Sequence, residues 1–298
     1  MVERVFVDAE GRLHAPWRLA VFALFSVGAL LVGTLLVYPA VSAALQVIGV
    51  RFVAWPWISL FGIGVGHLLM RHYGDRGITW THLGLDRPAA GAGLLGRSLA
   101  AGALAIVAPC VVLLAVQWLR VERAGDGGWT DVALSSALVL APAALYEELL
   151  FRGYGFVVLR EAFGWQTAVA GSSLLFALVH VANPGASAQS IVLVALAGLW
   201  LGTVRVVSGS LWATWAAHFG WNAAMLVVLH TPVSGLPFAT PVYRLVDAGP
   251  AWATGGVWGP EGGAFAALGM MAVTAALLAR PGGRALLARP LGRGETFA

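Results

Sequence analysis

Long apolar runs alternate with short polar segments along the whole chain, and this pattern predicts membrane-spanning helices. A helix needs about 20 mainly apolar residues to cross the hydrocarbon core of a bilayer. The runs that approach this length are Trp17–Val47, Phe52–Met70, Ser98–Leu119, Val132–Val158, Trp165–Ala182, Gln189–Val206, Leu211–His230 and Gly262–Ala279. We therefore expect an all-α fold, a polytopic membrane helix bundle with about eight transmembrane helices, and one integral membrane domain over residues 1–298.

The polar segment between the last two runs is rich in Pro, Gly and Trp. It covers residues 231–261, and we expect it to lie at the membrane interface with Trp252 and Trp258 as anchors at the level of the lipid headgroups. Within the sixth run, Gly198 and Gly202 are four residues apart, a spacing that favours close contact with another helix.

Composition agrees with a membrane protein. Hydrophobic residues make up 59% of the chain and charged residues 11%, with a mean hydropathy of +0.82, whereas about a quarter of the residues of a soluble domain are charged. The net charge of +4 raises the question of nucleic acid. The arginines flank apolar runs rather than forming a basic stripe, so we expect no nucleic-acid partner. The single cysteine, Cys110, lies in an apolar run and is expected to serve packing.

Orientation follows from the arginines, because cytoplasmic loops of membrane proteins carry an excess of positive charge. With the N-terminus inside, the cytoplasmic side receives Arg4, Arg12, Arg18, Arg71, Arg76, Arg87, Arg97, Arg160, Arg205, Arg280, Arg284, Arg289 and Arg293. The other side receives Arg51, Arg120, Arg123 and Arg244. This distribution favours both termini in the cytoplasm.

The fourth run contains three charged residues, Glu147, Glu148 and Arg152. Each such side chain costs roughly 2.5 to 3.5 kcal/mol at the membrane centre, so the cluster marks a functional site unless its members only pair with one another. Residues four apart share a helix face, which predicts a buried ion pair between Glu148 and Arg152. Glu147 points elsewhere and is left free to act as a base or a metal ligand.

Two further runs carry groups with suitable chemistry. Phe176 and His180 share a face of the fifth run, and His218 and Asn222 share a face of the seventh. Imidazole ligates metals or carries a proton near neutral pH, and asparagine donates or accepts hydrogen bonds. His67 has no such partner, so we expect a structural role for it.

The Glu-Glu-x-x-x-Arg of residues 147–152, the Phe-x-x-x-His of 176–180 and the His-x-x-x-Asn of 218–222 occur in that order on successive apolar runs. Together they resemble the motifs of the CPBP family of intramembrane proteases, which includes CAAX prenyl endopeptidases and proteins of bacteriocin self-immunity. The resemblance covers roughly residues 131–230.

The resemblance implies an intramembrane endopeptidase with a defined set of site residues. Its catalytic residues would be Glu147, Glu148, Arg152, His180, His218 and Asn222. Two mechanisms fit them. In one, Glu147, His180 and His218 hold Zn²⁺, which activates a water, and this metal-assisted reading is slightly favoured because two imidazoles and a carboxylate suit a catalytic zinc. In the other, Glu147 and His180 activate the water without metal, and His218 with Asn222 stabilises the oxyanion.

Two other classes of function use similar residues. Buried acids, histidines and arginines also build proton relays in transporters, and a non-catalytic relative would act as a membrane scaffold or immunity factor. The chain shows no duplicated half, which weighs against a transporter, and no motif residue is lost, which weighs against a scaffold. As partners we expect the lipid bilayer and a membrane protein or lipidated peptide as substrate, and as location the bacterial plasma membrane.

Overall fold

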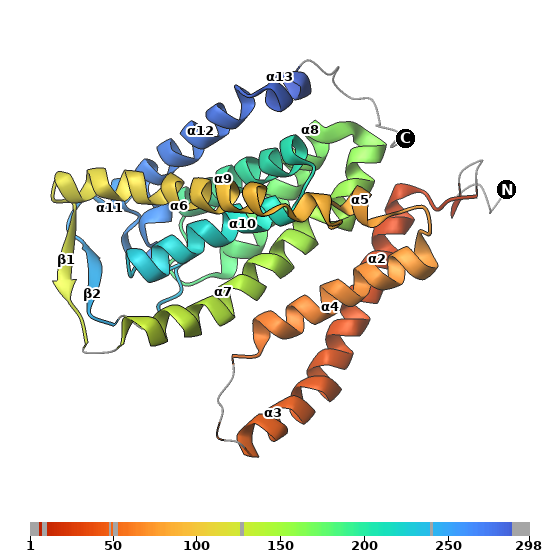
Figure 1. Cartoon of the computed structure of the whole chain (residues 1–298), viewed down its shortest axis with the longest axis horizontal. Helices are drawn as coiled ribbons and strands as arrows, with labels where there is room; N and C mark the ends of the chain where they lie inside the picture. Colours follow the sequence, from red (N-terminus) through yellow and green to blue (C-terminus); the bar gives the residue numbers. More distant parts are fainter. Residues whose placement is uncertain are drawn as a thin grey trace.

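The computed structural model is a bundle of helices with a small two-stranded sheet at one end (Figure 1). It describes residues 6–7, 11–47, 49, 53–125, 128–238 and 241–287. Four of the counted arginines, Arg4, Arg51, Arg289 and Arg293, lie outside the described residues.

The helices and strands follow one another in a simple order. The α-helices are α2 (Ala15–Val32), α3 (Tyr38–Val47), α4 (Trp55–Leu69), α5 (Trp80–Leu83), α6 (Ala92–Ala115), α7 (Trp129–Arg152), α8 (Tyr154–Val179), α9 (Ala188–Ser208), α10 (Leu211–Ala223), α11 (Ala251–Thr254), α12 (Ala264–Leu278) and α13 (Pro281–Leu287). The π-helical segments are η1 (Gly33–Val37), η2 (Met70–Gly74) and η5 (Ala224–Val228). The 3-10 segments are η3 (Pro88–Ala90), η4 (His180–Ala182), η6 (Gly256–Trp258) and η7 (Pro260–Gly262), and the strands are β1 (Leu119–Arg123) and β2 (Tyr243–Asp247).

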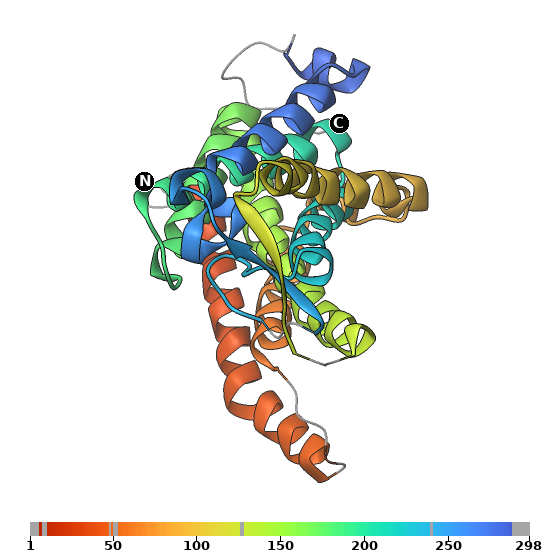
Figure 2. The ribbon, with the colours of Figure 1, turned by 90° about the vertical axis from the view of Figure 1, so that its left-hand side faces the viewer.

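The N-terminal helices form an arm beside the main bundle. Helix α2 continues through η1 into α3, packs along α4, and extends away from the other helices in the view from the sheet end (Figure 2). Arg18 ties the base of this arm to the bundle. Its guanidinium lies 2.5 Å from Asp75 and 2.6 Å from Glu161, and its Nε donates to the Tyr154 hydroxyl.

The main bundle is built from α6, α7, α8, α9, α10 and α12. Helices α6 and α10 share the largest interface, and α8 packs along α9. The predicted close contact at Gly198 and Gly202 is present. A Cβ atom on Gly198 would lie 2.8 Å from the Cα of Ser173, and one on Gly202 would lie 3.0 Å from Val169. Cys110 is buried in the hydrophobic core, in agreement with a packing role.

The predicted fourth span, Val132–Val158, is wrong at its end, because the helix stops at Arg152. The chain turns at Gly153, where a Cβ atom would lie 2.3 Å from both the His67 imidazole and the Leu149 carbonyl oxygen. His67 fills the structural role expected of it. Its Nε2 accepts from the Tyr154 backbone N–H, the first of the new helix, and its Nδ1 donates to the Ile63 carbonyl. Helix α8 itself bends at Gly164, where φ is +84°.

The expectation of a purely helical fold missed the sheet. Strands β1 and β2 pair antiparallel, with Leu119 opposite Asp247 and Arg123 opposite Tyr243. Their closest ends, Arg123 and Tyr243, are 120 positions apart in the sequence, so no short hairpin turn predicts the pairing. The sheet joins the segment after α6 to the segment before α11.

The predicted count of eight spans is not confirmed. By length and composition, four helical stretches of the described residues are able to cross a membrane: Ala15–Val47, Ala92–Ala115, Trp129–Ala182 and Ala188–Ser208. The third of these contains two of the predicted spans. Helix α12 has 15 residues, fewer than the roughly 20 that a full crossing requires. Helices α4 and α10 continue directly into η2 and η5, and neither of these stretches is among the four.

Trp258 is not an interfacial anchor. Its side chain is only 1% exposed and packs in a hydrophobic cluster with Phe151 and Phe176. The segment after α10 therefore folds back into the protein there instead of lying flat on its surface. Trp252, in contrast, is exposed.

Candidate active site

The end of α7 carries two glutamates in different surroundings. Glu148 is fully buried, and its Oε1 accepts hydrogen bonds from Arg152 Nη1 at 3.2 Å and from His218 Nδ1 at 2.8 Å. The predicted ion pair between Glu148 and Arg152 is thus present. Glu147 projects from another face of the helix, and its carboxylate lies 3.8 Å from His218 Nε2.

Arg152 is held on several sides. Its Nη2 donates to the Gly198 carbonyl oxygen of α9 at 3.1 Å, and its guanidinium lies 4.6 Å from the centre of the Phe176 ring. The Arg152 carbonyl oxygen, exposed by the end of α7, accepts from Arg205 Nε. A buried arginine with a carboxylate, a carbonyl and an aromatic face as partners is compensated for its lost hydration.

A hydrogen bond at Nδ1 orients each of the two histidine rings, His180 and His218. His180 ends α8, and its Nδ1 lies 2.7 Å from the Phe176 carbonyl oxygen. His218 on α10 uses Nδ1 for Glu148. Both partners are acceptors, so each Nδ1 carries a proton and each Nε2 is available for other chemistry.

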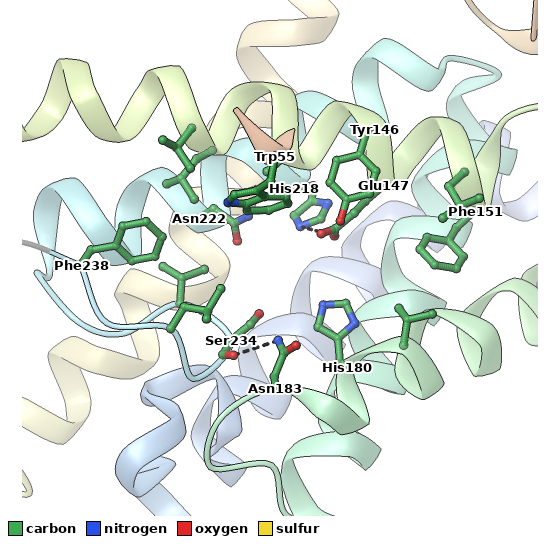
Figure 3. A pocket seen from close by; sticks show the side chains of 17 residues that line it. Trp55, Tyr146, Glu147, Phe151, His180, Asn183, His218, Asn222, Ser234 and Phe238 are labelled. Carbon is green, nitrogen blue, oxygen red and sulfur yellow. Dashed lines mark hydrogen bonds and ion pairs between the residues drawn. The ribbon is translucent and has the colours of Figure 1, made fainter. Parts of the chain in front are cut away.

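These residues line one cavity of about 390 Å³. Glu147, His218 and Asn222 lie along one side, and His180 faces them from the other (Figure 3). The structure therefore brings the sequence-predicted residues together. Four of them line the cavity: Glu147, His180, His218 and Asn222. Glu148 and Arg152 are fully buried and do not line it. The remaining lining is mostly apolar and comes from α4, α7, the end of α8 and residues 233–238.

The predicted zinc would be held by the Glu147 carboxylate and the imidazoles of His180 and His218. The chemical types suit the ion, since both Nε2 atoms and the Glu147 carboxylate are uncommitted to backbone partners. The positions do not fit. Among the described residues, no group of three His, Cys, Asp or Glu side chains lies close enough to hold a metal ion. Zinc binding stays a prediction.

Several residues of the cavity were not predicted from the sequence. Trp55 and Tyr146 contribute aromatic walls, with their ring centres 5.9 Å apart. Asn183 and Ser234 contribute polar groups, joined by a 3.0 Å bond from Asn183 Nδ2 to the Ser234 carbonyl oxygen (Figure 3). Asn183 follows His180 by three residues, which is the one local hint in the sequence. The positions of Trp55 and Ser234 depend on long-range packing.

A small second cavity adjoins the first. Its volume is about 40 Å³, and it shares His180, His218, Asn222 and Ser234 with the larger one. Its further lining includes the Glu261 carboxylate, from η7.

Comparison with known protein families gives one match. Residues 129–224, about a third of the chain, match the family described as type II CAAX prenyl endopeptidase Rce1-like. The resemblance to the intramembrane proteases of the CPBP family is confirmed over this segment, which holds all six predicted site residues. No curated protein and no solved structure matches the chain.

Proposed function

We propose that this protein, whose residues 129–224 match the Rce1-like CAAX prenyl endopeptidases, hydrolyses a peptide bond of a membrane-associated protein or peptide. The observation that carries the proposal is the cavity on which Glu147, His180, His218 and Asn222 converge. A carboxylate, two imidazoles and an amide around a space of this size supply a base, hydrogen-bond acceptors and oxyanion donors.

In the proposed first step, a water held between Glu147 and His180 attacks the scissile carbonyl carbon. Glu147 takes a proton from this water as the new carbon–oxygen bond forms. His180 Nε2 accepts a hydrogen bond from the second O–H of this water, which keeps that hydrogen, and so orients the attacking oxygen. The bond from Nδ1 to the Phe176 carbonyl supports this role, because it leaves Nε2 with its lone pair.

The carbonyl oxygen becomes an oxyanion in the tetrahedral intermediate. Asn222 Nδ2 and a protonated His218 Nε2 donate to it, and the Glu148 carboxylate at His218 Nδ1 stabilises the imidazolium. Glu147 then gives its proton to the amide nitrogen as the carbon–nitrogen bond breaks. The products are a carboxylic acid and an amine, so the water is fully consumed.

The lining of the cavity supports a lipid-modified or strongly apolar substrate. Apart from the proposed catalytic groups, the cavity is lined mainly by apolar side chains, such as those of Leu150, Val179, Val233 and Phe238. The family that residues 129–224 match is described as type II CAAX prenyl endopeptidase Rce1-like. A peptide that carries an isoprenoid on a cysteine near its C-terminus is therefore the first substrate to test.

The test is cleavage of defined peptides by the purified protein in liposomes, with products identified by mass spectrometry. A farnesylated peptide, its unmodified counterpart and an apolar helix peptide form the panel. We expect cleavage of at least one member and a loss of at least about a hundredfold in Glu147→Gln, which keeps the size of the side chain but removes the base. Equal rates for Glu147→Gln and the parent would overturn the proposal, and no cleavage of any panel member would favour the scaffold alternative.

The same assay decides the role of metal. The geometry of Glu147, His180 and His218 leads us to expect activity that survives a strong chelator. Close to one equivalent of zinc in the purified protein, together with loss of cleavage on chelation, would instead establish the metal-assisted mechanism.

A further inference from the structure

Glu261 lies outside the segment that matches the family, yet its carboxylate reaches the active site from η7. Its Oε2 accepts a 2.9 Å hydrogen bond from Trp221 Nε1, and Trp221 is the neighbour of Asn222 on α10. Its Oε1 accepts from the backbone N–H of Ser234. One carboxylate thus bridges the helix that bears His218 and Asn222 to the chain that follows it.

The segment held by Glu261 is residues 232–238, here termed the wall segment. Val233, Ser234, Leu236 and Phe238 of this segment line the catalytic cavity. The wall segment is also fixed from its other side, because the Ser234 carbonyl oxygen accepts from Asn183 Nδ2 and the Gly235 N–H donates to the Trp258 carbonyl. The peptide groups on both sides of Ser234 are therefore held by side chains.

The backbone at this point requires such support. Ser234 has φ of +51°, a left-handed conformation that is uncommon for residues other than glycine. Residues in this conformation persist only where their surroundings determine them. Next to it, Gly235 has φ of +76°, and a Cβ atom there would lie 2.0 Å from the Pro184 carbonyl oxygen. The wall segment is thus pressed against the turn that follows His180.

We propose that Glu261 is a positioning residue that fixes the wall segment and thereby sets which substrates the cavity accepts. The effect of Glu261 on substrate choice rests on the proposed peptidase function. Its effect on the conformation of the wall segment does not. Both groups that meet Glu261 are N–H donors, so they require two acceptor oxygens. A carboxylate supplies two, whereas an amide supplies one oxygen and one competing donor.

The test is Glu261→Gln, which preserves size and replaces one acceptor by a donor. Hydrogen exchange of the peptide that covers residues 231–238 should become faster, because the Ser234 N–H or the Trp221 indole loses its acceptor. In the cleavage assay, KM should rise about tenfold, equivalent to about 1.4 kcal/mol, with kcat within about twofold of the parent. Asn183→Asp, which places an acceptor against the Ser234 carbonyl oxygen, should loosen the same segment.

Asp247→Asn is the matched control. Asp247 also accepts two hydrogen bonds, from the Gly249 N–H and the Thr254 hydroxyl, in the same polar region of the chain but away from the cavity. We expect it to change neither the exchange of residues 231–238 nor KM. Unchanged exchange in Glu261→Gln overturns the proposal whether or not any peptide is cleaved. Faster exchange in Glu261→Gln with an unchanged KM would contradict the proposed role of Glu261 in substrate choice. A rise in KM of the same size in Asp247→Asn would contradict that role as well.

Discussion

At the scale of single residues, burial separates two neighbouring glutamates into different roles. The Glu147 side chain is 16% exposed and faces the cavity, whereas the Glu148 side chain is 0% exposed and lies between Arg152 and His218. The four-residue spacing of Glu148 and Arg152 predicts this separation, and the structure agrees with it. The difference arises because α7 turns one toward the cavity and the other toward α9 and α10.

This difference predicts different effects of the same substitution. Glu148→Gln should lower stability by about 3–5 kcal/mol, because it leaves the buried Arg152 without its anionic partner. Glu147→Gln should unfold close to the parent temperature while losing activity. Thermal unfolding of both variants in the same detergent measures this, and an equal loss of stability in the two would contradict the division of roles.

At the scale of helices, the site depends on where α7 and α8 end. Glu147 and Glu148 lie in the last two turns of α7, and His180 immediately follows α8. Helix α9 then supplies the carbonyl of Gly198 to Arg152, so the packing of α9 against α8 also fixes the ion pair.

Gly198→Ala therefore tests how strongly the helix contact controls the site. The added methyl group would overlap the Ser173 backbone, and overpacking of this kind costs about 1–3 kcal/mol. We expect a lower unfolding temperature and reduced cleavage. Gly171→Ala on α8 is the control, because a Cβ atom there meets nothing within 4 Å, and it should be neutral or slightly stabilising. Unfolding of both variants at the temperature of the parent would contradict a close helix contact at Gly198.

At the scale of the whole molecule, charge divides the two ends of the bundle. The start of α2 lies toward the end of the bundle opposite the sheet (Figure 1), and Arg18 of α2 pairs there with Asp75 and Glu161. The sheet end carries the β1 and β2 arginines. By the preference of positive charge for the cytoplasmic side, we expect the sheet to face away from the cytoplasm. The wall segment lies just before β2, so substrate should reach the cavity from that side.

Cysteine labelling in intact cells tests this orientation, with Cys110 replaced first. Val121→Cys in β1 is exposed and should react with an impermeant reagent, whereas Arg87→Cys, also exposed, should be protected until the membrane is permeabilised. The reverse labelling pattern would show the opposite orientation in the membrane, and substrate would then be expected to enter from the cytoplasmic side.

Local patterns in the sequence predict a membrane protein and the candidate residues that the structure brings to the cavity. Apolar runs, the four-residue spacing of Glu148 and Arg152, and the motifs at His180 and His218 depend on composition and helical periodicity, which are local properties. The pairing of β1 with β2, the end of α7 at Gly153 and the burial of Trp258 were decided by the tertiary structure. So was the reach of Glu261 to Ser234, 27 residues away. Each of these depends on atoms brought together from distant parts of the chain, and such contacts leave no regular pattern in a single sequence.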